Sequence, residues 1–442
     1  MHDTKGTLRK KDSVMVATSE SQATLPPVTR RRFLETSVIA GAGTLLGTAP
    51  FARTRQAPLL DPPFYKGMCY SAVFPPPYRP DNANSTCIFF GSDEAYDCME
   101  PLWGKGFTSA NGRRFMGRDD LRTINLMGVN LIRLYDWEPR NYHQRFLDYC
   151  QQLGIKVLAS VSDYFLNPDP NPINGGFRQR EIHIPKLIKS YSNGRQNNGG
   201  TDYHPAIVGI IFGNEPEIHH KFGIYESAEF TKDWVRIEQQ QFPGFRRPLI
   251  GHPVDFGKYG NEPYPQWNWW IDLLGRLAGT TTRDLQSRLF LAPQPQNDAS
   301  YLFENAQGSG KGYVQLTYER FRKPLLFTEI GYNRLIPGYL NVVDGQLRES
   351  IAYGAAHPEQ LLGICYFQFA DKVWKCPTFQ CSDTEGSFGA HSHTGTVLRT
   401  VDYVPGDFTH FDTGGCDREH LRVDELMRDP VYQKIVDNYI RR

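Results

Sequence analysis

The chain has 442 residues and an almost balanced charge, with 49 lysines and arginines against 48 aspartates and glutamates. This balance argues against a nucleic-acid partner and against a basic patch that would attract an anionic membrane surface. About 390 residues remain after the N-terminal targeting segment described next, which is more than an eightfold βα barrel needs and allows long loops.

Residues 1–53 are predicted to be a targeting region. The segment Thr29–Leu34, TRRRFL, precedes a weakly apolar stretch, Ser37–Ala52, that is rich in glycine, alanine and threonine. This arrangement resembles the twin-arginine signal of bacteria, with residues 1–28 as a polar lead. It implies transport by the twin-arginine export machinery and a periplasmic or secreted location. The apolar stretch is too short and too rich in glycine for a stable membrane span. The alternative is a basic linker followed by a short apolar helix.

Eight short apolar segments predict β-strands, and helical patterns separate most of them. Residues 54–63 are expected to form a linker, and residues 72–118 a long loop over the mouth of the sheet. Strands are expected over residues 64–70, 129–135, 156–161, 207–212, 248–254, 289–292, 325–328 and 362–369. Helices are expected over residues 119–126, 142–153, 184–193, 227–241, 267–277, 312–322 and 347–355.

This alternation predicts an α/β fold, a (β/α)8 TIM barrel over residues 64–375 with long loops over its C-terminal mouth. An open doubly wound sheet is the alternative, but no G-x-G-x-x-G motif follows the first strand. Residues 376–442 are expected to form a C-terminal extension, a glycine-rich loop and a helix, that packs on the barrel without forming a separate domain.

Two of the predicted strands end in a glutamate. In Ile207–Pro216, IVGIIFGNEP, an apolar run breaks at Asn214 and Glu215, and Pro324–Asn333, PLLFTEIGYN, presents Glu329 in the same way. The carboxyl ends of barrel strands form the mouth at which catalytic residues lie, and a two-carboxylate glycosidase needs such a pair. The alternative for the first motif is the start of a helix, with the asparagine as its N-cap.

At these residues the chain resembles the clan A retaining β-glycosidases. Within that clan, four segments are similar to the β-1,3-glucanosyltransferases of fungal walls and the related β-1,3-glucanases: KGMCY near the start, GVNLIRLYDWEPRNYH at 128–143, GNEP and TEIGYN. The resemblance implies an eightfold barrel with Glu215 as acid/base and Glu329 as nucleophile. It also implies that Arg133 lies near the end of the second strand and that an aromatic residue of 367–374 follows the eighth.

The expected roles follow from this assignment. Arg133 would favour the ionised carboxylate of Glu329, although a structural salt bridge is its alternative, and Asn214 would donate to the 2-hydroxyl of the sugar. The predicted substrate-binding residues are Asn214, Arg133, Tyr135, Asp136, Tyr332 and Trp374. The substrate is expected to be a polysaccharide or oligosaccharide, and no cofactor is expected.

Other motifs are ambiguous. The cluster of Trp267, Trp269 and Trp270 suits either core packing or a platform for sugar stacking. His219 and His220 with Glu217 could bind a metal, but loop histidines of this kind are commoner, and no metal site is predicted. The eight cysteines do not have zinc-site spacing. Cys150 and Cys365 are expected to be buried thiols, and disulfides after export are possible for two pairs: Cys87 with Cys98, and Cys376 with Cys381.

The predicted function is hydrolysis or transglycosylation of a β-glucan, with β-1,3 linkages favoured, by a retaining double displacement. One alternative is another β-linked polysaccharide, a β-1,4-glucan or a mannan. A second is a carbohydrate-binding barrel without turnover. A third, a metal-dependent hydrolase, would need a His-x-His pair near the first strand, and the segment from Tyr70 onward has none.

Overall fold

The residues described by the computed structural model all lie in one of the two units of the chain. Contacts divide the protein into two units, Met1–Gln56 and Ala57–Arg442, and every described residue belongs to the second. The described residues are 63–72, 93–108, 112, 114–168, 176–194, 200–215, 224–255, 271, 282–371, 386–402 and 420–441. The predicted twin-arginine segment therefore lies outside them.

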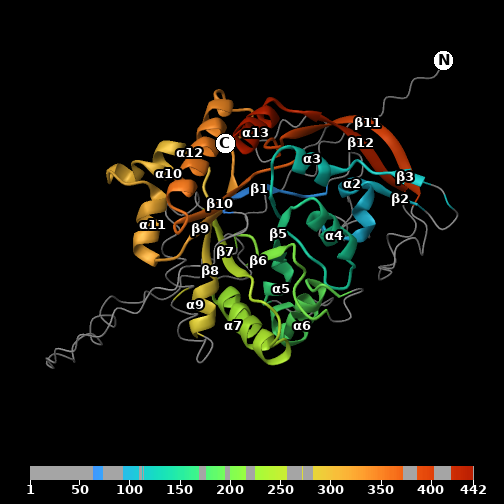
Figure 1. Ribbon diagram of the computed structural model, residues 1–442, viewed down its shortest axis with the longest axis horizontal. Coiled ribbons are helices and arrows are strands. Elements are labelled where there is room, and N and C mark those ends of the chain that lie inside the picture. The colour runs from blue at the N-terminus through green and yellow to red at the C-terminus, as the bar shows by residue number, and fades with distance from the viewer. Residues whose placement is uncertain are drawn as a thin grey trace, which may run out of the picture. The chain divides into compact units, whose positions relative to one another are not determined.

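Eight parallel strands close into a barrel in the order β1-β10-β9-β8-β7-β6-β5-β4 (Figure 1). Closure occurs at β1, where Gly67 is opposite Cys365 on one side and Leu131 on the other. The strands are β1 (Tyr65–Cys69), β4 (Leu131–Arg133), β5 (Lys156–Val161), β6 (Ile207–Phe212), β7 (Leu249–Asp255), β8 (Leu289–Gln294), β9 (Leu325–Ile330) and β10 (Leu361–Tyr366). All eight coincide with predicted segments, so the predicted (β/α)8 barrel is confirmed.

Each connection around the barrel carries helix. The principal helices are α3 (Asp120–Leu126), α4 (Gln144–Gln152), α6 (Arg180–Ser190), α7 (Ile224–Gln241), α9 (Thr282–Arg288), α11 (Tyr313–Phe321) and α12 (Tyr339–Ala356), with short α5 (Asp163–Leu166) and α10 (Ala299–Phe303). The predicted helix over 347–355 was too short, because Val343 is buried on the same side of α12 as Leu347 and Ile351 and extends the apolar face. The expected helix over 267–277 lies outside the described residues except for Ile271.

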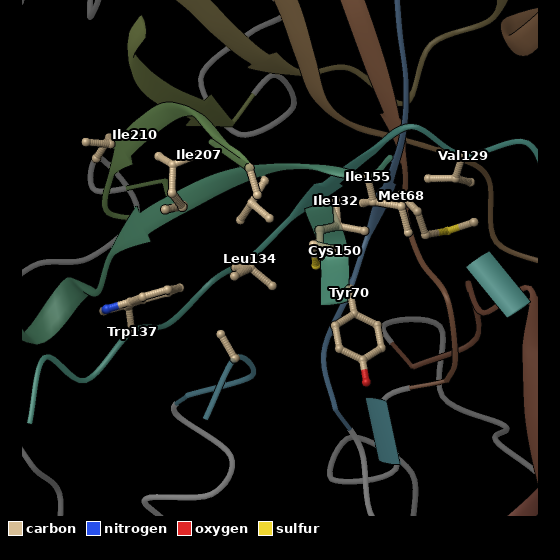
Figure 2. Packing of buried hydrophobic residues seen from close by; sticks show 14 of the residues in the cluster. Met68, Tyr70, Val129, Ile132, Leu134, Trp137, Cys150, Ile155, Ile207 and Ile210 are labelled. Carbon is tan, nitrogen blue, oxygen red and sulfur yellow. The ribbon is translucent and has the colours of Figure 1, made fainter. Parts of the chain in front are cut away.

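Two hydrophobic clusters occupy the two faces of the sheet. The larger lies between strands and helices, and Figure 2 shows part of it, including Met68 of β1, Ile132 of β4 and Cys150 of α4. The smaller fills the barrel interior with residues that alternate with the first set, among them Leu131 and Phe290. Alternation of this kind is required because successive side chains of a strand point to opposite faces of the sheet.

Glycine makes room for the large interior side chains. A Cβ atom at Gly251 of β7 would lie 2.2 Å from Cζ of Phe290, and one at Gly67 would lie 2.6 Å from Sγ of Cys365. Both distances are far below van der Waals contact, so an alanine at either position would displace its neighbour. The barrel is therefore a packed core rather than a channel, and the site must lie at its end.

Two regions contain more structure than was predicted. The segment expected to be a long loop over 72–118 carries the 3-10 helix η2 (Asp97–Met99), α2 (Glu100–Trp103) and a hairpin of β2 (Gly106–Thr108) and β3 (Arg114–Met116). Burial of Leu102 and Trp103 explains why this stretch folds. In the C-terminal region, β11 (His391–Asp402) and β12 (His420–Arg428) form an antiparallel hairpin before α13 (Pro430–Arg441).

The C-terminal helix α13 is joined to the first barrel strand. The Tyr439 hydroxyl donates to the Gly67 carbonyl at 2.9 Å, and the Lys66 ammonium donates to the Tyr439 carbonyl at 2.6 Å. The preceding hairpin is joined through a buried ionic group, in which Arg118 contacts Asp120 at 2.7 Å and Asp424 at 2.8 Å. In the described part of the chain, no helix is both long and apolar enough to cross a membrane.

Candidate active site

Glu329 is presented by β9 at the carboxyl end of the barrel. Its strand, LLFTEI, is buried along its whole length, and the glutamate is only 7% exposed. A guanidinium nitrogen of Arg133, Nη1, donates to Oε1 of Glu329. The Tyr135 hydroxyl donates to the same oxygen at 2.8 Å. Both contacts use Oε1, so Oε2 is the oxygen that the described contacts leave available for chemistry.

Arg133, the last residue of β4, is completely buried and holds the site together. Its other terminal nitrogen, Nη2, donates to Oδ1 of Asn214, and its guanidinium carbon lies 3.7 Å from the centre of the Tyr135 ring. Burial by itself lowers the pKa of Arg133, but the adjacent Tyr135 and Glu329 raise it above its ordinary value. The arginine is therefore a permanent cation next to the Glu329 carboxyl group.

Tyr135 contributes a hydrogen-bond donor to the site rather than a negative charge. Burial raises the pKa of Tyr135 well above its ordinary value, although Arg133 lowers it, and Cys69 and Glu329 raise it further. The hydroxyl therefore keeps its proton and donates a hydrogen bond to Oε1 of Glu329. The structure brings Arg133, Tyr135 and Glu329 together. Arg133 and Glu329 form a buried ion pair, so the alternative of a structural salt bridge for Arg133 stays open.

Asn214 and Glu215 follow β6 on a sharply turned backbone. Gly213 has φ of 77° and Glu215 has φ of 49°, a left-handed conformation that is unusual for a glutamate. The backbone N–H of Asn214 donates to Oδ1 of Asp163 at 2.7 Å, which fixes the turn between these two residues. Glu215 is half-buried. The alternative of a helix N-cap at Asn214 concerns residues 216–223, which lie outside the described residues.

Gln294, at the end of β8, was not predicted to belong to the site. Its Nε2 donates to Oδ1 of Asn214 at 2.9 Å, beside the Arg133 contact to the same atom. The signal was present in the sequence, because Gln294 is the polar end of an otherwise apolar strand, LFLAPQ, as Glu329 is in β9. Asp163, which follows β5 and accepts from the backbone N–H of Asn214, was not predicted to belong to the site either.

The other predicted substrate-binding residues are Asp136, Tyr332 and Trp374, of which the structure describes the first two. Asp136 is half-buried, and its backbone N–H donates to Oε2 of Glu94 at 2.9 Å. Burial, followed by the charge of Asp136, raises the pKa of Glu94 well above its ordinary value. Tyr332 packs partly buried against the larger hydrophobic cluster and makes no hydrogen bond to the Arg133 group within the described residues. Trp374 lies outside the described residues, whereas Phe367, after β10, packs edge-on against Tyr135 with ring centres 6.4 Å apart.

Three cysteines of the described part, Cys69, Cys150 and Cys365, are buried and not joined in disulfides, which confirms the prediction of buried thiols for the last two. No group of three or more possible metal ligands occurs among the residues that the structure describes. The other motifs named from the sequence lie outside those residues: Glu217, His219 and His220, the cluster of Trp267, Trp269 and Trp270, and Cys87, Cys376 and Cys381; of Cys98, only the backbone in η2 is described.

The arrangement joins a carboxylate, a fixed cation and an oriented amide, with a second carboxyl group adjacent in sequence to the amide. Arg133 links Glu329 of β9 to Asn214 after β6, and Glu215 is the next residue. Such a site pairs one carboxyl group with a fixed cation and places a hydrogen-bond donor next to a second carboxyl group. These groups are the ones that nucleophilic attack assisted by a proton donor requires.

Comparison with known proteins found distant structural likeness only. No family model and no curated protein sequence matches the chain. Among solved structures, it is similar to Saccharomyces cerevisiae Gas2p in complex with laminaripentaose, with 15% identity and a TM-score of 0.43 over 85% of this chain and 64% of that chain. It is also similar to Gas2p in complex with laminaritriose and laminaritetraose, with 14% identity and a TM-score of 0.42 over 85% of this chain and 64% of that chain. The chain thus spans less than two thirds of these structures, and the likeness is too distant to indicate a substrate.

Proposed function

We propose that this protein is a retaining glycoside hydrolase or transglycosylase that acts on a β-glucan, with β-1,3 linkages favoured. The observation that carries the proposal is the buried Arg133, which donates both to the Glu329 carboxylate and to the Asn214 amide beside Glu215. The preference for β-1,3 linkages rests on the sequence similarity of the KGMCY, GNEP and TEIGYN segments.

In the first step, Oε2 of Glu329 attacks the anomeric carbon of the sugar. The bond from that carbon to the leaving oxygen breaks, and the leaving oxygen takes a proton from Glu215. Arg133 and the Tyr135 hydroxyl hold Oε1 of the nucleophile, so that the attacking oxygen is fixed in direction. A covalent glycosyl ester on Glu329 results.

In the second step, water or a sugar hydroxyl gives its proton to the Glu215 carboxylate and attacks the same anomeric carbon. The ester bond to Glu329 breaks, and the configuration of the sugar is retained. Asn214 donates to the sugar 2-hydroxyl throughout, a contact that strengthens as the ring flattens in the transition state. For this mechanism we expect the two carboxyl groups to lie about 5 Å apart.

Matched carboxylate variants test the mechanism. Glu329→Gln should abolish turnover of every substrate while oligosaccharide binding, measured by calorimetry, persists. Glu215→Gln should still react with an aryl glycoside whose leaving group needs no protonation, and a covalent adduct should accumulate because no base activates water. Peptide mass mapping should place the adduct on Glu329. An adduct on another residue, or a product of inverted configuration, would overturn the assignment.

Product analysis tests the substrate. The protein should release oligosaccharides from β-1,3-glucan faster than from β-1,4-glucan, β-1,6-glucan or mannan, and added oligosaccharide acceptors would reveal transglycosylation as longer products. If the protein prefers β-1,4-glucan or mannan, the proposed mechanism would stand, but the proposed substrate would be wrong. Binding to β-glucan without turnover by the wild-type protein would favour the carbohydrate-binding barrel instead.

We also propose that the protein is exported by the twin-arginine route. The support is the TRRRFL segment at Thr29–Leu34 and the apolar stretch that follows it. A periplasmic or secreted location is compatible with a polysaccharide substrate, which is too large to enter the cytoplasm.

A further inference from the structure

We infer that Gln294 is a positioning residue that orients the Asn214 amide toward the substrate. This inference rests on the proposed function, because it concerns the donor that Asn214 offers to the sugar 2-hydroxyl. Gln294 is 4% exposed, and its Nε2 donates to Oδ1 of Asn214 at 2.9 Å. It acts through Asn214 rather than on the substrate.

The charge of Arg133 determines which way the Asn214 amide points. An asparagine amide presents an oxygen at one end and an NH2 group at the other, and the two ends have nearly the same shape. A guanidinium has donors and no acceptor, so only the oxygen of Asn214 can face Nη2 of Arg133. Rotation of the amide by half a turn would bring its NH2 group against a buried cation.

Gln294 completes this orientation. With Oδ1 of Asn214 facing Arg133, the Gln294 atom near the same oxygen must be the NH2 end of its own amide. Oδ1 then accepts two hydrogen bonds, which uses both of its lone pairs. The two donors come from different strands, β4 and β8, and together they define both the plane and the direction of the Asn214 amide. With Arg133 as the single donor, the amide could still rotate about that hydrogen bond.

The other end of the Gln294 amide indicates that the residue is not optimised for stability. Its Oε1 is buried and has no hydrogen-bond partner within the described part of the chain. An unsatisfied buried acceptor is unfavourable, and an apolar side chain would avoid this cost. Oε1 of Gln346 is in the same position, so the inference rests on the contact of Gln294 with Asn214 and not on this cost.

The test compares two substrates that differ only in the hydroxyl that Asn214 contacts. One is an aryl β-laminaribioside, and the other is its analogue without the 2-hydroxyl on the glucose that carries the aryl group. Gln294→Met keeps the length of the side chain and removes the donor. We expect kcat/KM for the parent substrate to fall about tenfold, mainly through kcat, since the contact strengthens in the transition state. The value for the analogue should stay within about twofold.

Two controls separate positioning from a general loss of structure. Gln346 is a fully buried glutamine of α12 whose Nε2 donates to the Asn297 carbonyl at 2.8 Å, and Gln346→Met should leave the ratio between the two substrates unchanged. In the background of Asn214→Ala, Gln294→Met should have no further effect on the ratio, because there is no amide left to orient.

An equal fall on both substrates, or effects of Gln294→Met and Asn214→Ala that multiply, would overturn the inference while leaving the proposed function intact. A wild-type protein that turns over neither substrate nor any β-glucan would overturn the proposed function and the role of Gln294 with it.

Discussion

The buried pair of Arg133 and Glu329 allows a quantitative test in which stability, not activity, is measured. The perturbations are Arg133→Met, Glu329→Gln and the double variant. Arg133 has no solvent exposure and Glu329 only 7%, so each charge depends on the other for compensation. Removal of one member of such a pair leaves an uncompensated buried charge, which costs about 3–5 kcal/mol of unfolding free energy.

The two single variants should differ in a way that the contacts predict. Arg133→Met removes the counter-charge of Glu329 and the donor to Asn214, so we expect a loss of about 4 kcal/mol. Glu329→Gln leaves a side-chain oxygen that still accepts from Arg133 and Tyr135, and the arginine keeps Asn214, so a loss of about 2 kcal/mol is expected.

The double variant shows whether Arg133 and Glu329 stabilise the fold as a pair. Additive effects would give a loss of about 6 kcal/mol, but the double variant has neither buried charge, so we expect only about 3 kcal/mol. Equilibrium urea unfolding followed by the fluorescence of the 7 tryptophans measures all four proteins. A double-variant loss within about 0.5 kcal/mol of the sum would show that Arg133 and Glu329 do not act as a pair.

Three further predictions concern packing, pH and export. Gly251→Ala should cost about 1–3 kcal/mol in thermal unfolding, because its Cβ would lie 2.2 Å from Phe290, and Phe290→Leu should recover part of the loss; no loss would contradict the packed interior. Burial lowers the pKa of His252 from 6.5 to about 3, so the unfolded chain takes up the proton first on acidification. Relative to His252→Gln, the wild type should therefore lose about 1.4 kcal/mol of unfolding free energy per pH unit below pH 6.5, and parallel pH profiles would refute this. Arg30→Lys with Arg31→Lys should hold the protein in the cytoplasm on cell fractionation, and unchanged export would exclude the twin-arginine route.

Most of the eight strands could be predicted from the sequence because they are short apolar runs that break at a polar or glycine residue. β6 and β9 are examples: IVGIIF and LLFTEI are buried almost throughout, as expected for a parallel sheet with both faces covered. Since the carboxyl ends of parallel strands meet at one mouth, the prediction that Glu215 and Glu329 belong to that mouth required no contact information.

The C-terminal hairpin could not be predicted in the same way. β11 and β12 pair across residues 403–419, and their sequences, HSHTGTVLRTVD and HLRVDELMR, are largely polar. What buries part of them is a charge network, with Asp424 accepting from Arg118 at 2.8 Å and from His393 at 2.7 Å. Contacts between residues some 300 positions apart leave no local periodicity that a sequence reading can detect.

Strand ends alone determined which residues could reach the mouth, but only the tertiary structure decided which of them touch. Arg133, Asn214, Gln294 and Glu329 come from four different strands, and their hydrogen bonds depend on the closure and register of the barrel. Gln294 was overlooked because a glutamine at a strand end carries no charge that singles it out. Its role became visible when Arg133 fixed the direction of the Asn214 amide, since side-chain orientation depends on partners that are distant in sequence and adjacent only in the folded chain.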